Sequence, residues 1–285
     1  MIAKIIDGRK IAKELRNNIS NEIGKLKSIY QISPNITTIK IGTDLSSELY
    51  LKLRDKACDE VGIISKHLEF PEKVTENQVL ESILKLNNDK NVHGILIQLP
   101  IPGHISQDKL INILDPKKDV EGLNPHNIGR TLNGDEYIVP ITPLSILTIL
   151  EYEKIELKGK DIVIVNHSNH VGKPLAALML NRNATVTICH IFTKNLRNYT
   201  SNADILITAT GVPMLIKNDY IKKGAFVIDV GIVKTENGIC GDVDFETVKT
   251  KAGRITPVPG GVGPVTVVCS LRNMIKTFQN CIEQK

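Results

Sequence analysis

A short apolar run, followed by a turn and a helix-forming segment, places the strongest constraint on how this chain can fold. Residues 162–165 are Ile-Val-Ile-Val, a β-branched run typical of a strand buried on both faces of a parallel sheet. Turn formers at 166–169 break the run, and residues 175–180 favour a helix. A strand, turn and helix in this order hold a dinucleotide pyrophosphate at the helix amino terminus in many α/β proteins. The segment indicates either a dinucleotide-binding unit or an ordinary βα unit without a ligand.

The turn lacks the glycine pattern that usually marks a dinucleotide-binding fold. Asn166 stands where the first glycine would be, and asparagine is the residue that next best tolerates a left-handed backbone. Gly172 and Pro174 follow before the helix-forming residues. The turn therefore leaves both interpretations open, and the rest of the chain has to decide between them.

Strand and helix patterns alternate along the chain, which predicts an α/β fold with a parallel sheet. We predict strands at residues 36–41, 63–70, 92–99, 162–165, 185–189, 205–209 and 225–230. We predict helices at residues 5–29, 46–61, 74–86, 108–114 and 265–281, and one that opens with Thr142 as N-cap and Pro143 at its first position. Residues 115–140 show no periodicity, and a long irregular segment in a compact domain is usually functional. The prediction is two α/β lobes, with ligands in a cleft between them.

Composition excludes several classes of function for these 285 residues. The net charge is +5 with both signs interspersed, aromatic residues make up 4% and Trp is absent, so we expect no nucleic-acid partner. The five cysteines are scattered and odd in number, which indicates a reducing cytoplasm. No apolar run approaches the length of a membrane span. His167, His170 and the Cys189-His190 pair do not complete a zinc set, so we predict no metal.

Several polar residues stand where an α/β fold places its ligand contacts. Tyr50 and Arg54 are four residues apart and share one helix face, either as a site for an anionic substrate or as part of an exposed basic helix. Gln98 and Asp229 stand at the ends of predicted strands. Asp119 and Glu121 flank Gly122, where the carboxylates either bind amino groups of a heterocycle or stabilise the turn.

Together these segments resemble the bifunctional methylenetetrahydrofolate dehydrogenase/methenyltetrahydrofolate cyclohydrolase family. The resemblance covers nearly the whole chain, through residues 4–12, 50–63, 94–102, 118–130, 193–196, 227–232, 241–245 and 256–264, of which the last, TPVPGGVGP, is highly specific. It implies a homodimer whose chains each have a folate-binding catalytic domain, residues 1–140 plus 266–285, and a Rossmann-type NAD(P)-binding domain, residues 141–265. The implied reactions pass hydride from methylenetetrahydrofolate to NADP, then hydrolyse methenyltetrahydrofolate to formyltetrahydrofolate.

The resemblance also implies roles for individual residues. Those expected to be catalytic are Tyr50, Arg54, Gln98 and Glu121. Those expected to bind substrate are Ser47, Tyr50, Leu99, Pro100, Pro259, Gly260, Gly261 and Pro264. Those expected to bind the cofactor are Asn166, His167, Ser168, Val171, Gly172, Ile191, Thr210, Gly211 and Ile232, with Pro174 completing the pyrophosphate turn.

Two departures from the family pattern concern the chemistry. Arg54 stands in place of the family's catalytic lysine, and a guanidinium keeps its charge but cannot give up its proton. If that lysine must act as a base, hydrolysis should be weak. Glu121 stands in place of the pterin-binding aspartate, with the same charge and a longer reach. A dehydrogenase with weak or no cyclohydrolase activity is therefore an alternative, and a non-catalytic folate- or nucleotide-binding subunit is another.

Two further departures concern the cofactor. His167 replaces an arginine suited to the extra phosphate of NADP, while Ile191 and Phe192 offer neither a hydroxyl nor a charge. His167 or His190 would substitute in part when protonated. NAD, or weak NADP binding, is thus an alternative to NADP.

Overall fold

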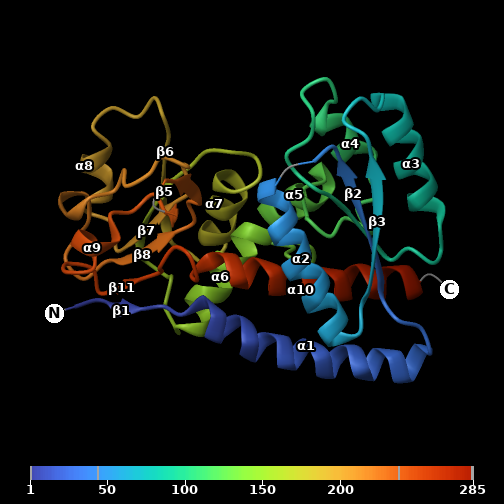
Figure 1. The fold of residues 1–285 in the computed structure, drawn as a ribbon. Coiled ribbons are helices and arrows are strands. Elements are labelled where there is room, and N and C mark those ends of the chain that lie inside the picture. Colours follow the sequence, from blue (N-terminus) through green and yellow to red (C-terminus); the bar gives the residue numbers. More distant parts are fainter. Residues whose placement is uncertain (1, 44, 237, 284–285) are drawn as a thin grey trace. The chain divides into compact units, whose positions relative to one another are not determined.

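The structure is a computed structural model that describes residues 2–43, 45–236 and 238–283, without the side chains of residues 45–47 and 49. The chain divides into two compact units. The first unit comprises residues 1–13 and 142–266, and the second comprises residues 14–141 and 267–285. The division falls within α1 (Gly8–Tyr30) and α10 (Val262–Ile282), and after the first residue of α6 (Ile141–Tyr152), so each of these helices contributes to both units (Figure 1).

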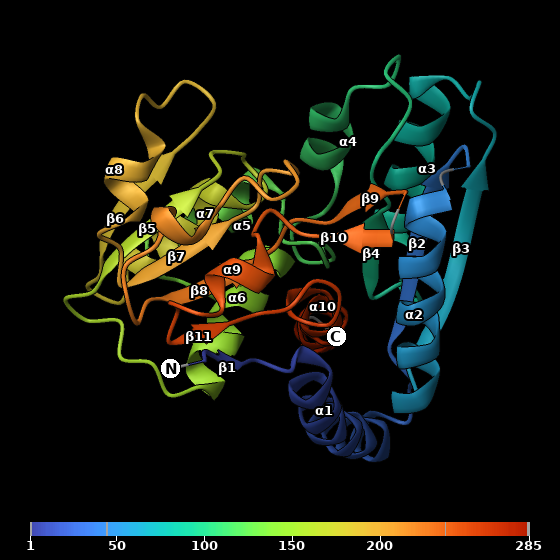
Figure 2. The ribbon, with the colours of Figure 1, turned by 60° about the vertical axis from the view of Figure 1, so that its left-hand side comes forward.

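The first unit is built on a six-stranded parallel sheet in the order β1-β11-β8-β7-β5-β6 (Figure 2). Its strands are β1 (Lys4–Ile5), β5 (Asp161–Val165), β6 (Thr185–Cys189), β7 (Ile205–Thr208), β8 (Phe226–Asp229) and β11 (Arg254–Ile255). The other elements are α6 (Ile141–Tyr152), α7 (Gly172–Leu180), α8 (Leu196–Thr200), η1 (Asn218–Tyr220), α9 (Phe245–Val248) and a hairpin of β9 (Val233–Thr235) and β10 (Gly238–Cys240). β5 comes before both β6 and β7 in the sequence, and these two strands pair with it on opposite sides. The direction in which the chain adds strands to the sheet therefore reverses at β5.

The apolar run that led the prediction forms the centre of this sheet. Residues 162–165 are all buried in β5, and Val163 and Val165 pack with Leu206, Val227 and Ile255. Burial on both faces explains why the run shows no alternation of polar and apolar residues.

The second unit contains a three-stranded parallel sheet in the order β3-β2-β4, formed by β3 (Ile64–Phe70), β2 (Asn35–Ile41) and β4 (Gly94–Ile97). Its helices include α2 (Leu45–Val61), α3 (Glu76–Asn88), α4 (Gln107–Ile113) and α5 (Pro125–Leu132). Residues 118–120 run beside β4, where Ile95 N–H donates to Lys118 O at 2.7 Å and Val120 N–H donates to Ile95 O at 3.2 Å. This pairing places the segment with Asp119 and Glu121 next to the sheet.

The structure contains elements that the sequence prediction lacks, namely β1, β9, β10, β11, α5, α8, α9 and η1, and four differences concern predicted features directly. The segment 115–140 contains α5, which Asn124 caps by accepting from His126 N–H. Residues 4–5 form a strand because they pair with β11. Thr142 is not an N-cap, because α6 already begins at Ile141. Asn166 does not use a left-handed backbone, since it is absent from the positive-φ residues.

Candidate functional site

The turn after β5 is held by the side chain of Asn166. Its Oδ1 accepts from the N–H groups of Ser168 and Gly172, both at 2.9 Å, and from the Ser168 hydroxyl at 2.8 Å. Its Nδ2 donates to Ala209 O beyond the end of β7 at 2.6 Å. Gly172 opens α7 so close to the turn that a Cβ there would lie 2.0 Å from Asn166 O. The side chain of Asn166 thus organises the turn and sets the start of α7.

Two buried aspartates hold the other loops at the carboxyl edge of this sheet. Asp229 Oδ1 accepts from Gly231 N–H at 2.9 Å and Oδ2 accepts from Val243 N–H at 2.9 Å. Burial raises the pKa of Asp229 to about 7. Asp242 accepts from the Thr208 hydroxyl at 2.8 Å and from Gly211 N–H at 2.9 Å.

Sequence reasoning had not singled out Asp242, and the GDVDF segment at 241–245 was the signal for it. The carboxylate of Asp229, a predicted ligand contact at a strand end, instead accepts from the backbone N–H groups of Gly231, Asp242 and Val243. Through Thr210 and Gly211, both bound to Asp242, these carboxylates position two of the residues predicted to bind the cofactor.

The same edge presents apolar side chains and two imidazoles to solvent. Ile191, Phe192 and Ile232 are 86%, 81% and 67% exposed, in the loops that follow β6 and β8. The rings of His167 and His190 lie 4.8 Å apart between centroids. Phe192 N–H donates to His190 Nδ1 at 3.2 Å, so the neutral His190 carries its proton on Nε2. His190 therefore offers an N–H donor that no other described residue occupies.

In the second unit, α2 buries Arg54 completely. Its Nη2 donates to the Thr38 hydroxyl on β2 at 2.7 Å, and its Cζ lies 6.0 Å from the centre of the Tyr50 ring. Its Nε and Nη1 are buried without a hydrogen-bond partner among the described residues. The helix is therefore not simply an exposed basic surface, whereas Lys52 and Lys56 on its other faces are exposed.

Gln98 follows the carboxyl end of β4, and its N–H donates to Ile39 O on β2 at 2.9 Å. Its side-chain Nε2 donates to Leu99 O at 2.8 Å, while its Oε1 is buried without a partner among the described residues. Arg54 and Gln98 are thus anchored to consecutive residues of β2 and each retains unused hydrogen-bonding capacity. Such buried unpaired groups are uncommon and call for an external partner.

Asp119 and Glu121 have different roles at the turn. Asp119 accepts from Gly122 N–H at 3.0 Å, from Asn124 N–H at 2.8 Å and from Asn127 Nδ2 at 3.0 Å, so it stabilises the turn. The carboxylate of Glu121, which is half-buried, has no hydrogen-bond partner among the described residues. Burial raises the pKa of Glu121 to about 7, with the Arg54 charge acting to lower it and Asp119 acting to raise it.

The Pro/Gly loop predicted to bind substrate lies in the first unit, against the start of α1. Gly8 N–H donates to Gly260 O at 2.9 Å, and a Cβ at Gly8 would lie 1.7 Å from Gly261 O. Only glycine allows this approach, which explains the glycine of the amino-terminal KIIDGRK segment. Pro259 is exposed at the loop surface, and Pro264 lies in the first turn of α10.

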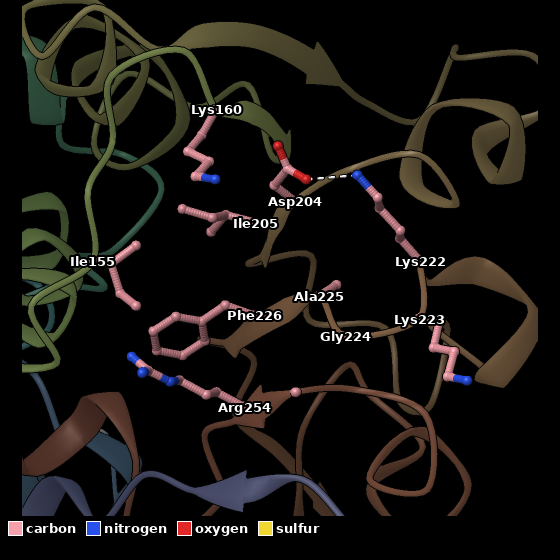
Figure 3. A pocket seen from close by; sticks show the side chains of 11 residues that line it. Ile155, Lys160, Asp204, Ile205, Lys222, Lys223, Gly224, Ala225, Phe226 and Arg254 are labelled. Carbon is pink, nitrogen blue, oxygen red and sulfur yellow. Dashed lines mark hydrogen bonds and ion pairs between the residues drawn. The ribbon is translucent and has the colours of Figure 1, made fainter. Parts of the chain in front are cut away.

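A further depression of about 350 Å³ lies at the opposite, amino-terminal edge of the six-stranded sheet (Figure 3). Lys222 pairs with Asp204 across it at 2.6 Å, and Arg254 lies 5.9 Å from the Phe226 ring centre. None of the predicted site residues lines it. Its backbone N–H groups at Asp204, Ala225 and Phe226 are bonded to neighbouring carbonyls, so it is not a preformed anion site.

The structure thus gathers the predicted residues into separate groups. Tyr50, Arg54, Gln98, Leu99, Pro100 and Glu121 belong to the second unit, while the predicted cofactor residues and the 259–264 loop belong to the first. The side chain of Ser47 lies outside the described residues. Among the residues described, no group of three or more His, Cys, Asp or Glu side chains is arranged to hold a metal, and no helix is long and apolar enough to span a membrane.

Comparison with known families finds two matching domain descriptions. "Tetrahydrofolate dehydrogenase/cyclohydrolase, catalytic domain" matches residues 6–121, and "Tetrahydrofolate dehydrogenase/cyclohydrolase, NAD(P)-binding domain" matches residues 140–282. Among individual relatives, the bifunctional protein FolD of Methanococcoides burtonii is 47% identical over 276 residues, covering 97% of this chain and 96% of its own.

Solved structures give the same result. The bifunctional enzyme FolD, methylenetetrahydrofolate dehydrogenase/cyclohydrolase, from Campylobacter jejuni has a TM-score of 0.95 and 42% identity, covering 98% of this chain and 99% of its own. The Trypanosoma brucei FolD, solved with NADP cofactor and an inhibitor, has a TM-score of 0.94 and 33% identity, with 99% of both chains covered.

Proposed function

The chain belongs to the tetrahydrofolate dehydrogenase/cyclohydrolase family, and from this premise we propose how its own residues perform the two reactions of a bifunctional enzyme. It oxidises methylenetetrahydrofolate to methenyltetrahydrofolate with NADP and hydrolyses the methenyl product to formyltetrahydrofolate, in one-carbon metabolism. The folate chemistry belongs to the second unit and cofactor binding to the first.

The unpaired buried groups around Arg54 are the observation that supports the folate site. Buried N–H groups of a charged guanidinium are costly when unpaired, so the Nε and Nη1 of Arg54 favour an acceptor brought by the ligand. Gln98 Oε1 needs a donor in the same way. A pterin offers both, because its ring carries a carbonyl oxygen and amino groups. Tyr50, beside Arg54, provides an aromatic face against which the pterin would pack.

The carboxyl edge of the first unit fits NADP. The exposed apolar side chains of Ile191 and Ile232 provide surfaces for the rings of the cofactor, and the amino terminus of α7 provides the partial positive charge of the helix dipole for the pyrophosphate. Dinucleotide folds that select NAD place a carboxylate after the second strand to read the ribose 2′-hydroxyl. Residues 189–195 after β6 contain no Asp or Glu, and neither do residues 166–173. The extra phosphate of NADP therefore meets no like charge.

His167 and His190 are the groups best placed to hold that phosphate in the absence of an arginine. Their rings lie together, and Nε2 of His190 is a free donor. A hydrogen bond to a phosphate from imidazole is weaker than a bidentate arginine contact. We therefore expect NADP to bind in preference to NAD by a modest factor.

The protein's contribution to hydride transfer is positional and electrostatic. When bound, NADP accepts the hydride that leaves the methylene carbon. Glu121 offers its carboxylate, which has no competing hydrogen bond, to the amino groups of the pterin ring and so contributes to substrate binding. Arg54 and Gln98 fix the pterin relative to that carboxylate.

The assembly and location are part of the same proposal. We propose a homodimer in a reducing cytoplasm, supported by the family resemblance and by five cysteines that all remain free thiols. Light scattering of the purified chain tests the assembly, and a mass of one chain at assay concentration would contradict it.

The function itself is tested by the initial rate of cofactor reduction with methylenetetrahydrofolate. We expect turnover with NADP that exceeds turnover with NAD. Absence of turnover with either cofactor, from protein that is folded by circular dichroism, would contradict the proposal and favour a non-catalytic binding subunit.

A further inference from the structure

Hydrolysis of the methenyl cation requires a group that the dehydrogenase step does not need. Water must lose a proton as its oxygen adds to the methenyl carbon, and a positioned base contributes about 10²–10⁴-fold to such steps. Arg54 cannot be that base, because a guanidinium stays protonated at any working pH. Its buried hydrogen bond to Thr38 shows that it is held as a fixed cation.

Four other titratable groups, on α2 and on the turn that carries Glu121, are excluded by their positions. Lys52 and Lys56 are exposed on the other faces of α2. Cys58 is buried, and desolvation raises the pKa of its thiol to about 12. Asp119 has both carboxylate oxygens occupied by backbone and amide N–H donors of its own turn.

Glu121 remains, and its surroundings suit the role. The turn that carries it is fixed on one side by Asp119 and on the other by Ile141 N–H, which donates to Glu121 O at 3.2 Å. Asn273 of α10 adds donors to Val120 O and Val139 O at 2.9 and 2.8 Å. The backbone is thus rigid, while the carboxylate itself is half-buried and unpartnered among the described residues.

We propose that Glu121 is the proton acceptor of the hydrolysis step and takes the task that a lysine would otherwise perform at position 54. The assignment rests on the proposed function and deepens it. Water oxygen forms a bond to the methenyl carbon while one water proton passes to Glu121. The bond from the hydroxyl-bearing carbon to one of its two nitrogens then breaks as the C=O double bond forms and the hydroxyl proton passes to that nitrogen, and the second C–N bond is kept in the formyl product. One proton is released to solvent overall, so charge and atoms balance.

The ionisation of Glu121 supports this assignment. Burial raises its pKa to about 7, with the Arg54 charge opposing that rise and Asp119 adding to it. A base acts in its deprotonated form, so hydrolysis should increase as pH rises through about 7. Hydride transfer needs no base and should show no such increase.

The test measures hydrolysis of methenyltetrahydrofolate directly, without any nicotinamide cofactor, and subtracts the enzyme-free rate at each pH. Glu121→Gln keeps the size of the side chain but cannot accept a proton, and Glu121→Asp keeps the carboxylate. Glu81→Gln, at an exposed glutamate of α3, is the matched control. We expect the Gln variant to lose about 100-fold in kcat and the pH increase with it. The Asp variant should recover part of the rate and retain the increase, and the control should match the parent chain.

Dehydrogenase turnover by the same variants separates this inference from the proposed function. The Gln variant should lose much less in hydride transfer than in hydrolysis, mostly through the KM for folate. Hydrolysis by Glu121→Gln at the parent rate, or a parent profile without an increase near pH 7, would overturn the role of Glu121 while leaving the dehydrogenase intact. Parent protein without any cofactor reduction would instead contradict the proposed function.

Discussion

Arg54 and Thr38 form a fully buried hydrogen bond, in which Nη2 of the guanidinium donates to the threonine hydroxyl at 2.7 Å. It joins the middle of α2 to the middle of β2. Since the remaining guanidinium nitrogens have no partner among the described residues, this bond fixes the orientation of the guanidinium group.

Replacing Thr38 by valine should therefore reduce both reactions. The change removes a hydrogen bond to a charged group, worth roughly 1.5–3 kcal/mol, so kcat/KM should fall about tenfold or more. Thr37→Val is the control, because consecutive residues of a strand face opposite sides and Thr37 is also buried. Equal loss in both variants, measured by cofactor reduction and by methenyl hydrolysis, would contradict an oriented role for Arg54.

Removing the charge of Arg54 should shift the pH dependence of hydrolysis. The guanidinium lowers the pKa of Glu121, so Arg54→Met should move the increase in rate to higher pH, whereas Arg54→Lys should leave it near its original position. The position of the increase is the readout, because both variants also lose rate. A midpoint that stays constant in Arg54→Met would show that the titrating group lies outside the field of this side chain.

His190→Ala and His167→Ala should impair the use of NADP more than that of NAD. Loss of one hydrogen bond to the extra phosphate should raise KM for NADP by about tenfold. His126→Ala, at an exposed histidine of the other unit, should change neither KM. The measurement is the ratio of the KM for NADP to the KM for NAD. An equal rise in both KM values would show that these histidines do not bind the extra phosphate of NADP.

Asp242→Asn should destabilise the protein. The side chain is fully buried and accepts hydrogen bonds from the Thr208 hydroxyl and from the Thr210 and Gly211 N–H groups. The NH₂ group of an asparagine in this place would face these donors and could not accept from them. The free energy of unfolding should fall by about 2–4 kcal/mol. Asp219→Asn breaks only an exposed pair with Arg197 and should cost about 0–1 kcal/mol. Denaturant titration followed by circular dichroism compares the two.

Gly172→Ala should disturb the turn that receives the cofactor. The added Cβ would lie 2.0 Å from Asn166 O, so the backbone must move and KM for NADP should rise. Gly24→Ala in α1 meets no atom within 4 Å and should stabilise the helix by about 0.5–1 kcal/mol. Hydrolysis, which uses no nicotinamide, should be nearly unchanged in Gly172→Ala; a comparable loss there would indicate general unfolding.

Much of the fold was predictable because local pattern and burial agree. The six-stranded and three-stranded sheets consist of parallel strands, several of whose apolar runs, such as residues 162–165 and 94–97, are visible in the sequence, and β6 has the predicted bounds. The strand β1 was not predictable, since two residues with exposed side chains carry no pattern and depend on pairing with β11. The helix α5 was missed although Asn124-Pro125 is a recognisable start, because its single amphipathic stretch is short.

The residues of the candidate site were predictable from the sequence, but the role of each residue was not. The resemblance identified Arg54 and Glu121 as departures, yet only the structure shows that Arg54 is completely buried and that Asp119, not Glu121, stabilises the turn. Asp229 looked like a ligand contact because it ends a strand, and its hydrogen bonds to distant backbone could not be inferred from spacing. Such partners are set by tertiary contacts.

The claim that one chain performs both reactions is tested most directly by one time course, in which methenyltetrahydrofolate and reduced cofactor are followed together from methylenetetrahydrofolate and NADP. The account predicts that reduced cofactor accumulates while methenyl product stays below the level left by its spontaneous hydrolysis. Methenyl product that builds up in step with reduced cofactor would contradict the claim and identify the chain as a dehydrogenase alone.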